Sequence, residues 1–224
     1  MDLLEAIQKR HAVRKYTTQP IPADIITALQ DEITACNQAG GLHIQLITDE
    51  PAAFGSVLTH YGFFSNVRNY VALIGKKDAA LDEKIGYYGE KIALRAQQLG
   101  LNTCWVALTF SKGKSKNNCV IGPDETLVCV LTVGYGITQG TPHKNKPLEK
   151  LCTVNGPMPD WFRKGMEAAQ LAPTAVNQQK FLFTLSDGNT VTAKATGGFY
   201  DKVDLGIVKY HFEIGAGKEN FNWG

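Results

Sequence analysis

One stretch of the sequence constrains the fold more than any other. Residues 126–136, TLVCVLTVGYG, form a continuous apolar run that is rich in β-branched side chains. Such a run is typical of a β-strand buried on both faces, whereas a strand with one wet face alternates apolar and polar residues. The sequence therefore predicts a β-strand that is buried on both faces.

Helical patterns surround this strand. The spacing of apolar residues predicts a short helix that ends near Arg10, a second helix that begins near Pro22, and a long helix over residues 81–99. Residues 40–49 alternate like a half-buried strand, and residues 68–75 read as another strand. We therefore expect a mixed α and β fold.

The last third of the chain repeats this pattern. Residues 157–175 start like the second helix, and FLFTLSD at 181–187 resembles HIQLITD at 43–49. Residues 85–96 and 205–216 align without gaps and match a glycine with a glycine. Because both echoes occur in the same order, we favour an internal duplication of a helix–strand–helix unit. The alternative is two generic amphipathic segments.

Composition limits the class of protein. A chain of 224 residues with 44% hydrophobic residues can bury a real core, and a net charge of +2 with dispersed basic residues argues against nucleic-acid binding. Five cysteines without a Cys-x-x-Cys pair indicate buried free thiols in a reducing compartment. The N-terminus lacks a signal-peptide pattern, and no segment approaches the roughly 20 apolar residues that span a bilayer. We expect a cytoplasmic protein with no membrane partner.

Two motifs could bind a ligand. In QKRHAVRKY, residues 8–16, the planar forks of Arg10 and Arg14 suit a phosphate or another oxyanion, although basic residues also suit a helix C-terminus. In LAPTAVNQQKF, residues 171–181, a hydroxyl, an asparagine and two glutamines crowd one turn before an apolar strand. A plain helix exit that uses Pro173 and Asn177 as turn residues would also explain this composition.

Together these motifs resemble a known family. IQKRHAVRKYTTQPIP resembles the N-terminal signature of the nitroreductase family of FMN-dependent oxidoreductases, and APTAVNQQKF resembles its Ala-Pro-Ser-x-x-Asn-x-Gln-Pro-Trp turn. LRAQQLGLNTCWVA and HKNKPLEKL resemble its later helix–loop and C-terminal basic segments. The resemblance implies an α+β fold with a central, mainly antiparallel sheet flanked by helices.

The order of the motifs departs from the family pattern. In the family, the asparagine turn follows soon after the arginine motif, and two identical subunits share each FMN. Here the matching turn comes much later in the chain. The resemblance therefore implies a first half over residues 1–155 with the arginine motif and a shorter second half over residues 156–224 with the turn. We expect the halves to pack as one globular unit, a monomer with pseudo-twofold symmetry and one complete flavin site.

Residue roles follow from the resemblance. Arg10 matches the contact to the FMN phosphate, Arg14 matches the basic residue beside the pyrimidine edge of the flavin, and residues 105–108 match a loop near the flavin N5. Two departures are Ala12 in place of a serine and Lys180-Phe181 in place of Pro-Trp. The expected FMN contacts are Arg10, His11, Ala12, Arg14, Ala107, Leu108, Lys144, Lys146, Pro173, Thr174, Asn177 and Gln179.

The expected activity is transfer of a hydride from NAD(P)H through FMN to a small nitroaromatic or quinone-like acceptor, with no side chain as nucleophile or obligatory acid. The alternatives are an FMN-binding protein without turnover, such as a store or sensor, and a flavin-consuming or dehalogenating relative on the same fold. The five histidines form no HExxH-type pair, so no metal site is expected. Glu90 and Arg95 are expected on a solvated helix face.

Overall fold

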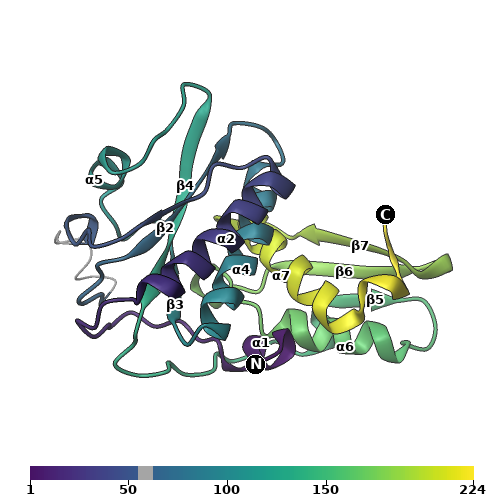
Figure 1. Ribbon diagram of the computed structural model, residues 1–224. Helices are drawn as coiled ribbons and strands as arrows, with labels where there is room; N and C mark the ends of the chain where they lie inside the picture. Colours follow the sequence, from purple (N-terminus) through teal and green to yellow (C-terminus); the bar gives the residue numbers. More distant parts are fainter. Residues whose placement is uncertain (55–62) are drawn as a thin grey trace. The chain divides into compact units, whose positions relative to one another are not determined.

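The computed structural model describes residues 1–54 and 63–224 (Figure 1). His60, one of the histidines weighed above, lies outside the described residues. The chain forms two compact units. The N-terminal unit comprises residues 9–81 and 91–141, and the C-terminal unit comprises residues 1–8, 82–90 and 142–224. The expected division at residue 155 concerns sequence repetition rather than packing, and it stays a prediction.

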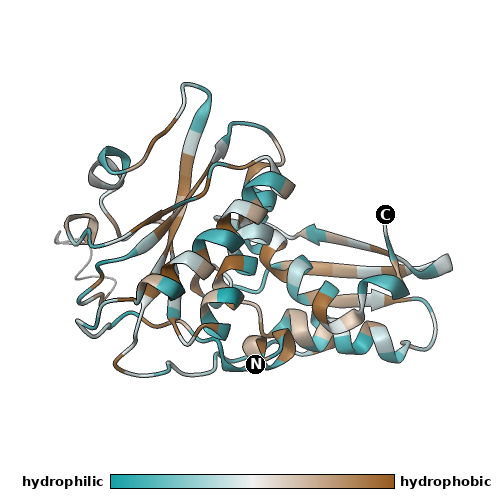
Figure 2. Ribbon diagram, viewed as in Figure 1, coloured by the Kyte–Doolittle hydropathy of each residue, from teal (hydrophilic) through white to brown (hydrophobic). Residues whose placement is uncertain are grey.

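The N-terminal unit is built on a four-stranded antiparallel sheet. Its strands are β1 (Gln45–Ile47), β2 (Tyr70–Lys76), β3 (Asn102–Val106) and β4 (Glu125–Gly134), in the order β1-β2-β4-β3. The predicted apolar run forms β4, which is paired on both edges and buried over its second half. Figure 2 shows apolar residues along β2 and β4. The prediction of a strand buried on both faces is confirmed for the second half of β4.

Helices complete the N-terminal unit. They are α2 (Ala23–Gly40), the short α5 (Lys112–Asn117), the 3-10 turn η1 (Ala52–Phe54) and the C-terminal part of α4 (Leu81–Gln98). The helices predicted near residue 22 and over residues 81–99 are therefore confirmed. The loop expected over residues 105–108 was wrong in part, because Trp105 and Val106 pair with Leu131 and Val130 and belong to β3. The family resemblance had suggested a loop for this segment, although its β-branched residues favour a strand.

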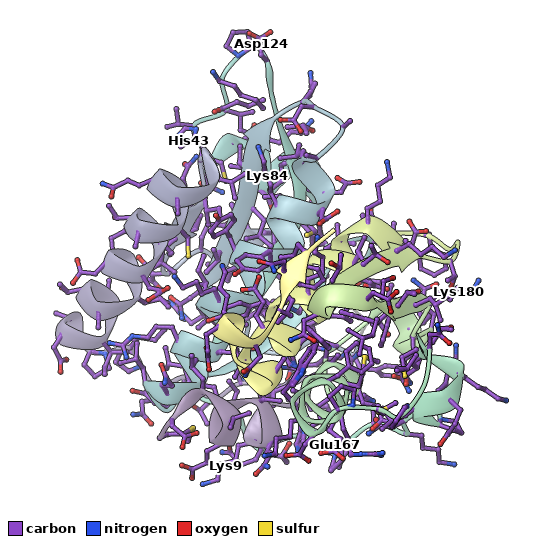
Figure 3. All side chains as sticks on the ribbon, turned by 90° about the vertical axis from the view of Figure 1, so that its right-hand side faces the viewer. Lys9, His43, Lys84, Asp124, Glu167 and Lys180 are labelled. Atoms are coloured by element: carbon purple, nitrogen blue, oxygen red, sulfur yellow. The ribbon has the colours of Figure 1, made fainter. Side chains whose placement is uncertain are left out.

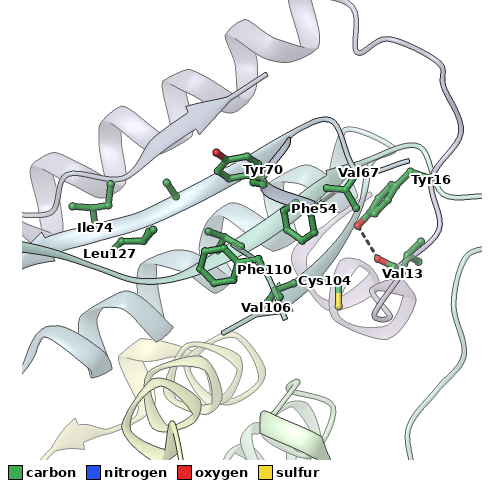
Figure 4. Packing of buried hydrophobic residues seen from close by; sticks show 13 residues of the cluster. Val13, Tyr16, Phe54, Val67, Tyr70, Ile74, Cys104, Val106, Phe110 and Leu127 are labelled. Carbon is green, nitrogen blue, oxygen red and sulfur yellow. Dashed lines mark hydrogen bonds between the residues drawn. The ribbon is translucent and has the colours of Figure 1, made fainter. Parts of the chain in front are cut away.

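One face of this sheet carries the core of the unit (Figure 4). Successive residues on a strand point to opposite faces, so alternate residues of β2 and β3 meet on the same side. In β4 the register shifts between its pairs with Leu73 and Ile74, so Leu127 and Val130, three residues apart, belong to the same cluster. The cluster is completed by residues from the loops. Its fully or nearly buried members include Tyr70, Ala72, Ile74, Cys104, Val106, Leu127 and Val130 from the strands, and Val13, Tyr16, Phe54 and Phe110 from elsewhere.

The C-terminal unit has its own four-stranded sheet. Its strands are β5 (Cys152–Val154), β6 (Phe181–Ser186), β7 (Thr190–Ala195) and β8 (Asn222–Trp223), in that order. β6 and β7 are antiparallel, whereas β5 pairs with β6 and β8 with β7 in parallel. Helices α6 (Asp160–Gln170) and α7 (Asp201–Ala216) pack tightly against each other, and α1 (Leu3–Lys9) completes the main elements. Buried aromatic rings of Phe162, Phe183 and Phe212 form its core.

The two units share an order of elements. Helix α2, strands β1 and β2, helix α4 and strand β3 occur in the same order as α6, β6, β7, α7 and β8. β2 and β3 both run antiparallel to β4, so they are parallel to each other, as β7 and β8 are. Among the described residues, no strand follows β8 that would correspond to β4. The expected α+β class is confirmed, while descent from a duplication stays a prediction.

Within the C-terminal unit, the first part of α4 crosses α7 at two glycines. A Cβ atom on Gly86 would lie 1.9 Å from the carbonyl oxygen of Val203, and one on Gly206 would lie 2.0 Å from that of Glu83. Each glycine therefore touches the backbone three residues before the other glycine. Only glycine allows two helix backbones to approach this closely.

This close crossing buries a polar pair that the sequence did not reveal. The expectation that Glu90 lies on a solvated face was wrong, because its side chain is 0% exposed and its Oε1 lies 3.0 Å from Nε2 of His211. Nδ1 of His211 lies 3.1 Å from the carbonyl oxygen of Ala168 and must donate to it. Arg95 is half-buried.

We predict that Gly86→Ala destabilises the protein by about 2 kcal/mol or more, because the added methyl group must push the two helix backbones apart. Gly113→Ala is the matched control, since a Cβ atom at Gly113 meets nothing within 4 Å. The measurement is the free energy of unfolding in urea. Equal stability of the two variants would contradict the described crossing.

Candidate functional site

The expected FMN contacts fall into two groups, one in each compact unit. The first group lies on the arginine segment, residues 10–16, which the backbone holds at several points. The amide of Val13 donates to Thr103 O at 3.0 Å, and the amide of Tyr16 donates to Ser65 O at 3.1 Å. The amide of Ser65 in turn donates to Arg14 O at 3.0 Å. The backbone of the segment is therefore fixed, on one side by β3 and on the other by Ser65 in the loop before β2.

The side chain of Tyr16 adds a buried fixing point. Its hydroxyl group donates to Val13 O at 2.7 Å and lies 2.6 Å from Thr132 Oγ1 (Figure 4). Burial, the largest cause, raises the pKa of Tyr16 well above its usual range, so the hydroxyl remains protonated. A Cβ atom on Gly134 would lie 3.1 Å from the ring of Tyr16, so the glycine at the end of β4 leaves room for this side chain.

Two guanidinium groups leave this segment in different surroundings. Arg10 is 3% exposed, whereas Arg14 is exposed. Burial raises the pKa of the Cys104 thiol, while the positive charges of Arg14 and Arg10 act in the opposite direction, which places both charges near this β3 residue. Arg10 makes other contacts, and its Nε and Nη1 are buried N–H donors at the start of this segment. A bound oxyanion such as a phosphate would fit these donors.

The remaining members of the first group also follow β3. Ala12 is exposed and forms a parallel bridge with Thr103, and His11 packs against Gly140, where a Cβ atom would lie 2.7 Å from that of the histidine. Ala107 and Leu108 follow directly after the last residue of β3, and Leu108 is 64% exposed. The structure thus places Ala12, Ala107 and Leu108 beside β3 or directly after it, and His11 against Gly140.

A cavity of about 250 Å³ lies in the same unit. Aromatic rings of Phe54 and Phe64, whose centroids are 5.5 Å apart, form one part of its wall. Ser65, which hydrogen-bonds to the Arg14 backbone, also lines it. The other lining residues are Thr18, Pro51, Asn66, Val67 and Arg68. An apolar wall with a few polar groups is typical of small-molecule sites.

The second group of expected contacts forms a hydrogen-bonded network in the C-terminal unit. Asn177 Nδ2 and Gln179 Nε2 both donate to Lys144 O, at 2.9 and 2.8 Å. Gln179 Oε1 accepts from the amide of Lys146 at 2.8 Å, and Thr174 Oγ1 accepts from the amide of Gln179 at 3.0 Å. The structure therefore brings together the basic segment and the turn, which are distant in the sequence. Pro173 lies half-buried just before this turn.

The two lysines of this group differ in their surroundings. Lys146 Nζ donates to the carbonyl oxygens of Gln178 and Gln179 at 2.7 and 3.0 Å, so two of its three protons brace the turn. Lys144 has an exposed side chain. Lys180, which replaces the proline of the family motif, is exposed at the outer surface of the unit (Figure 3).

A carboxylate missed by the sequence analysis supports the same turn. Asp204, in the first turn of α7, is 4% exposed and accepts hydrogen bonds from the amide of Ala175 and from Gln178 Nε2. Its position reads as an ordinary acidic residue at a helix start, so the sequence carried no signal for this contact. Three residues of the turn have positive φ, namely Val176, Asn177 and Gln179.

Aromatic residues that could stack over a flavin ring lie in both units. Phe63 is 74% exposed, and Phe64 packs on the core of the N-terminal unit. Tyr87 contacts the rings of Tyr88 and Tyr210 at centroid distances of 5.1 and 5.0 Å within the C-terminal unit.

Other kinds of site were also considered. In the part of the chain that the structure describes, no group of three or more His, Cys, Asp and Glu side chains could hold a metal ion. None of the described helices has the length and apolar character needed to cross a membrane. All five cysteines are free thiols, and Cys119 is the one that is partly exposed.

A family model described as "Putative TM nitroreductase" matches residues 2–216, and the chain belongs to this nitroreductase family. The resemblance seen in the motifs is therefore confirmed. Members of the nitroreductase family are FMN-dependent. No curated protein matches the chain significantly.

Solved structures share the fold. A nitroreductase family structure from Thermotoga maritima MSB8 has a TM-score of 0.68 and 22% identity, covering 98% of this chain and 85% of its own. One from Desulfovibrio desulfuricans in complex with FMN has a TM-score of 0.55 and 13% identity, covering 71% and 99%. A third, from Bacteroides thetaiotaomicron VPI-5482 and named an NADH dehydrogenase/NAD(P)H nitroreductase, has a TM-score of 0.52 and 17% identity, covering 66% and 95%.

We predict that Tyr16→Phe lowers the free energy of unfolding by about 1–2 kcal/mol, because Val13 O loses its buried donor. Tyr135→Phe, on a half-buried side chain at the end of the same sheet, is the control and should change stability far less. The measurement is urea unfolding followed by circular dichroism. If Tyr16→Phe were as stable as the wild type, the hydroxyl group would not hold the arginine segment.

Proposed function

We propose that the protein is an FMN-dependent oxidoreductase that moves a hydride from NAD(P)H to a small nitroaromatic or quinone-like acceptor. Family membership supports the flavin and the oxidoreductase class. The name of the Bacteroides structure, which includes NAD(P)H, supports the choice of donor. The observation that carries the proposal is the buried guanidinium of Arg10 on a segment that matches the family signature.

A buried guanidinium has lost most of its hydration, and this loss is costly unless an anion compensates it. The planar fork of arginine can grip two phosphate oxygens at once, which lysine cannot do. We propose that the phosphate of FMN is the anion that Arg10 binds. Its position on a backbone fixed at Thr103 and Ser65 means that little ordering is needed when the ligand arrives.

Arg14 has a different proposed task. Its guanidinium is exposed while its backbone carbonyl is bound by Ser65, so the charge is available to a ligand on a fixed support. We propose that Arg14 stabilises negative charge at the pyrimidine edge of the isoalloxazine ring. FMN, when bound, supplies the electron storage, and the protein supplies charge, shape and exclusion of water.

The other proposed contacts come from both units. In the N-terminal unit they are His11, Ala12, Ala107 and Leu108, and in the C-terminal unit they are Lys144, Lys146, Pro173, Thr174, Asn177 and Gln179. Ala12 lacks the hydroxyl of the usual serine, which weakens flavin binding by about 1 kcal/mol. We further propose one flavin per chain and a monomeric protein.

A second candidate function is flavin binding without turnover. The observation in its favour is that Phe54 and Phe64 narrow the cavity beside the Arg14 backbone, where a nicotinamide or an acceptor would need a free ring face. A store or sensor would bind FMN as tightly as an enzyme but would not pass electrons to an acceptor.

We predict that Arg10→Lys raises the dissociation constant of FMN about tenfold and that Arg10→Gln raises it further, because the fork and then the charge are lost. Quenching of FMN fluorescence on titration with apo-protein measures this constant. Arg163→Lys, on the exposed face of α6, is the matched control and should bind FMN like the wild type.

Circular dichroism of each variant separates a binding defect from misfolding, since Arg10 is buried. A folded Arg10→Gln variant that binds FMN with wild-type affinity would refute the phosphate role of Arg10. A wild-type protein that binds no FMN at all would refute the proposed function.

A further inference from the structure

Asp204 is a buried carboxylate that serves a turn rather than its own helix. Both of its oxygens lie within reach of the amide of Ala175, at 2.9 and 3.1 Å. Oδ2 also accepts from Gln178 Nε2 at 2.8 Å. The carboxylate therefore ties together both ends of the turn over residues 175–178.

The buried surroundings of Asp204 disfavour its ionised form. Burial raises the pKa of Asp204 to about 6, the bonds from Gln178 and Ala175 lower it, and the charge of Asp201 raises it. Because the pKa is higher in the folded than in the unfolded chain, its ionisation lowers stability as the pH rises from about 4 to about 6. At neutral pH the ionised carboxylate is thus less favourable for the fold than the protonated acid, while it accepts the hydrogen bonds from Ala175 and Gln178 that hold the turn.

The turn that Asp204 holds is strained. Val176 and Asn177 are consecutive residues with φ of 46° and 56°, a region that costs a β-branched residue most. Such a conformation persists only where the surroundings fix it. Gln178 gives a second fixing point, because its Nε2 also donates to Phe199 O at 3.1 Å.

The strained turn carries side chains of the proposed flavin site. Asn177 is exposed and Gln179 follows two residues later, and both reach Lys144 O. Without the carboxylate, the amide of Ala175 would lose its acceptor and the turn could relax away from its positive φ values. The free energy lost by burying the Asp204 carboxylate would be offset if the turn over residues 175–178 is held in the shape that a ligand requires.

We propose that Asp204 is a positioning residue for FMN, holding the turn over residues 175–178 in the shape that places Asn177 and Gln179. This inference rests on the proposed function. Asp204 itself does not touch the flavin in this account.

The test compares three variants by FMN titration, by the dissociation rate of FMN and by the melting temperature of the apo-protein. Asp204→Ala removes both bonds, and we expect the dissociation constant to rise roughly ten- to a hundredfold. Asp204→Asn keeps an acceptor for Ala175 but faces Gln178 with an amide, and we expect a smaller rise of about threefold to tenfold. Asp201→Asn, in the same helix turn, is the control and should bind FMN like the wild type.

A merely structural role would lower the melting temperature of the apo-protein and leave the dissociation rate of FMN unchanged. That result in Asp204→Asn, the milder variant, would overturn the inference even if Asp204→Ala did not fold. The expected result is the reverse, with faster dissociation and little change in melting temperature. If the wild type bound FMN and both variants bound it equally well, only this inference would fail. If the wild type bound none, the proposed function would fail with it.

Discussion

Strand β4 is the element on which the N-terminal unit depends. It pairs with β2 on one edge and with β3 on the other, so it fixes the register of both. Its end also fixes the arginine segment, because Thr132 meets the hydroxyl of Tyr16 and the amide of Thr17 donates to Tyr135 O. A buried strand thus fixes the backbone of the segment that carries the buried Arg10 and the exposed Arg14.

In the C-terminal unit, hydrogen bonds rather than a buried strand fix the turn that carries the expected contacts. The amide of Lys146 donates to the side chain of Gln179, and Nζ of Lys146 donates to the carbonyl oxygen of Gln179. Asp204 accepts a hydrogen bond from Ala175 on the other side of the same turn. Because buried donors and acceptors are costly when unmatched, such a network has few alternative arrangements. Rigid positioning of this kind suits a protein whose cofactor carries the chemistry, since the polypeptide then contributes orientation and charge.

The sequence predicted the long elements and the family, and it failed where contacts join distant residues. The apolar run of β4 and the periodicity of α4 carry strong local signals, so both were found. Glu90 was misplaced because its partner, His211, lies far along the chain and the glycine crossing that buries both leaves no periodic signal. Asp204 was missed for the same reason, since an acidic residue at a helix start has an ordinary local explanation. The arginine segment and the asparagine turn were recognised through motif similarity rather than through physical pattern.

The proposed function requires that the protein binds FMN and turns it over. The most direct test is the visible absorption spectrum of the protein reconstituted with FMN, recorded without oxygen before and after addition of NADH or NADPH. We predict a flavin band that bleaches with at least one nicotinamide and returns when a nitroaromatic or quinone acceptor is added. A bound flavin whose band survives both nicotinamides would contradict turnover with these donors and favour a binding role.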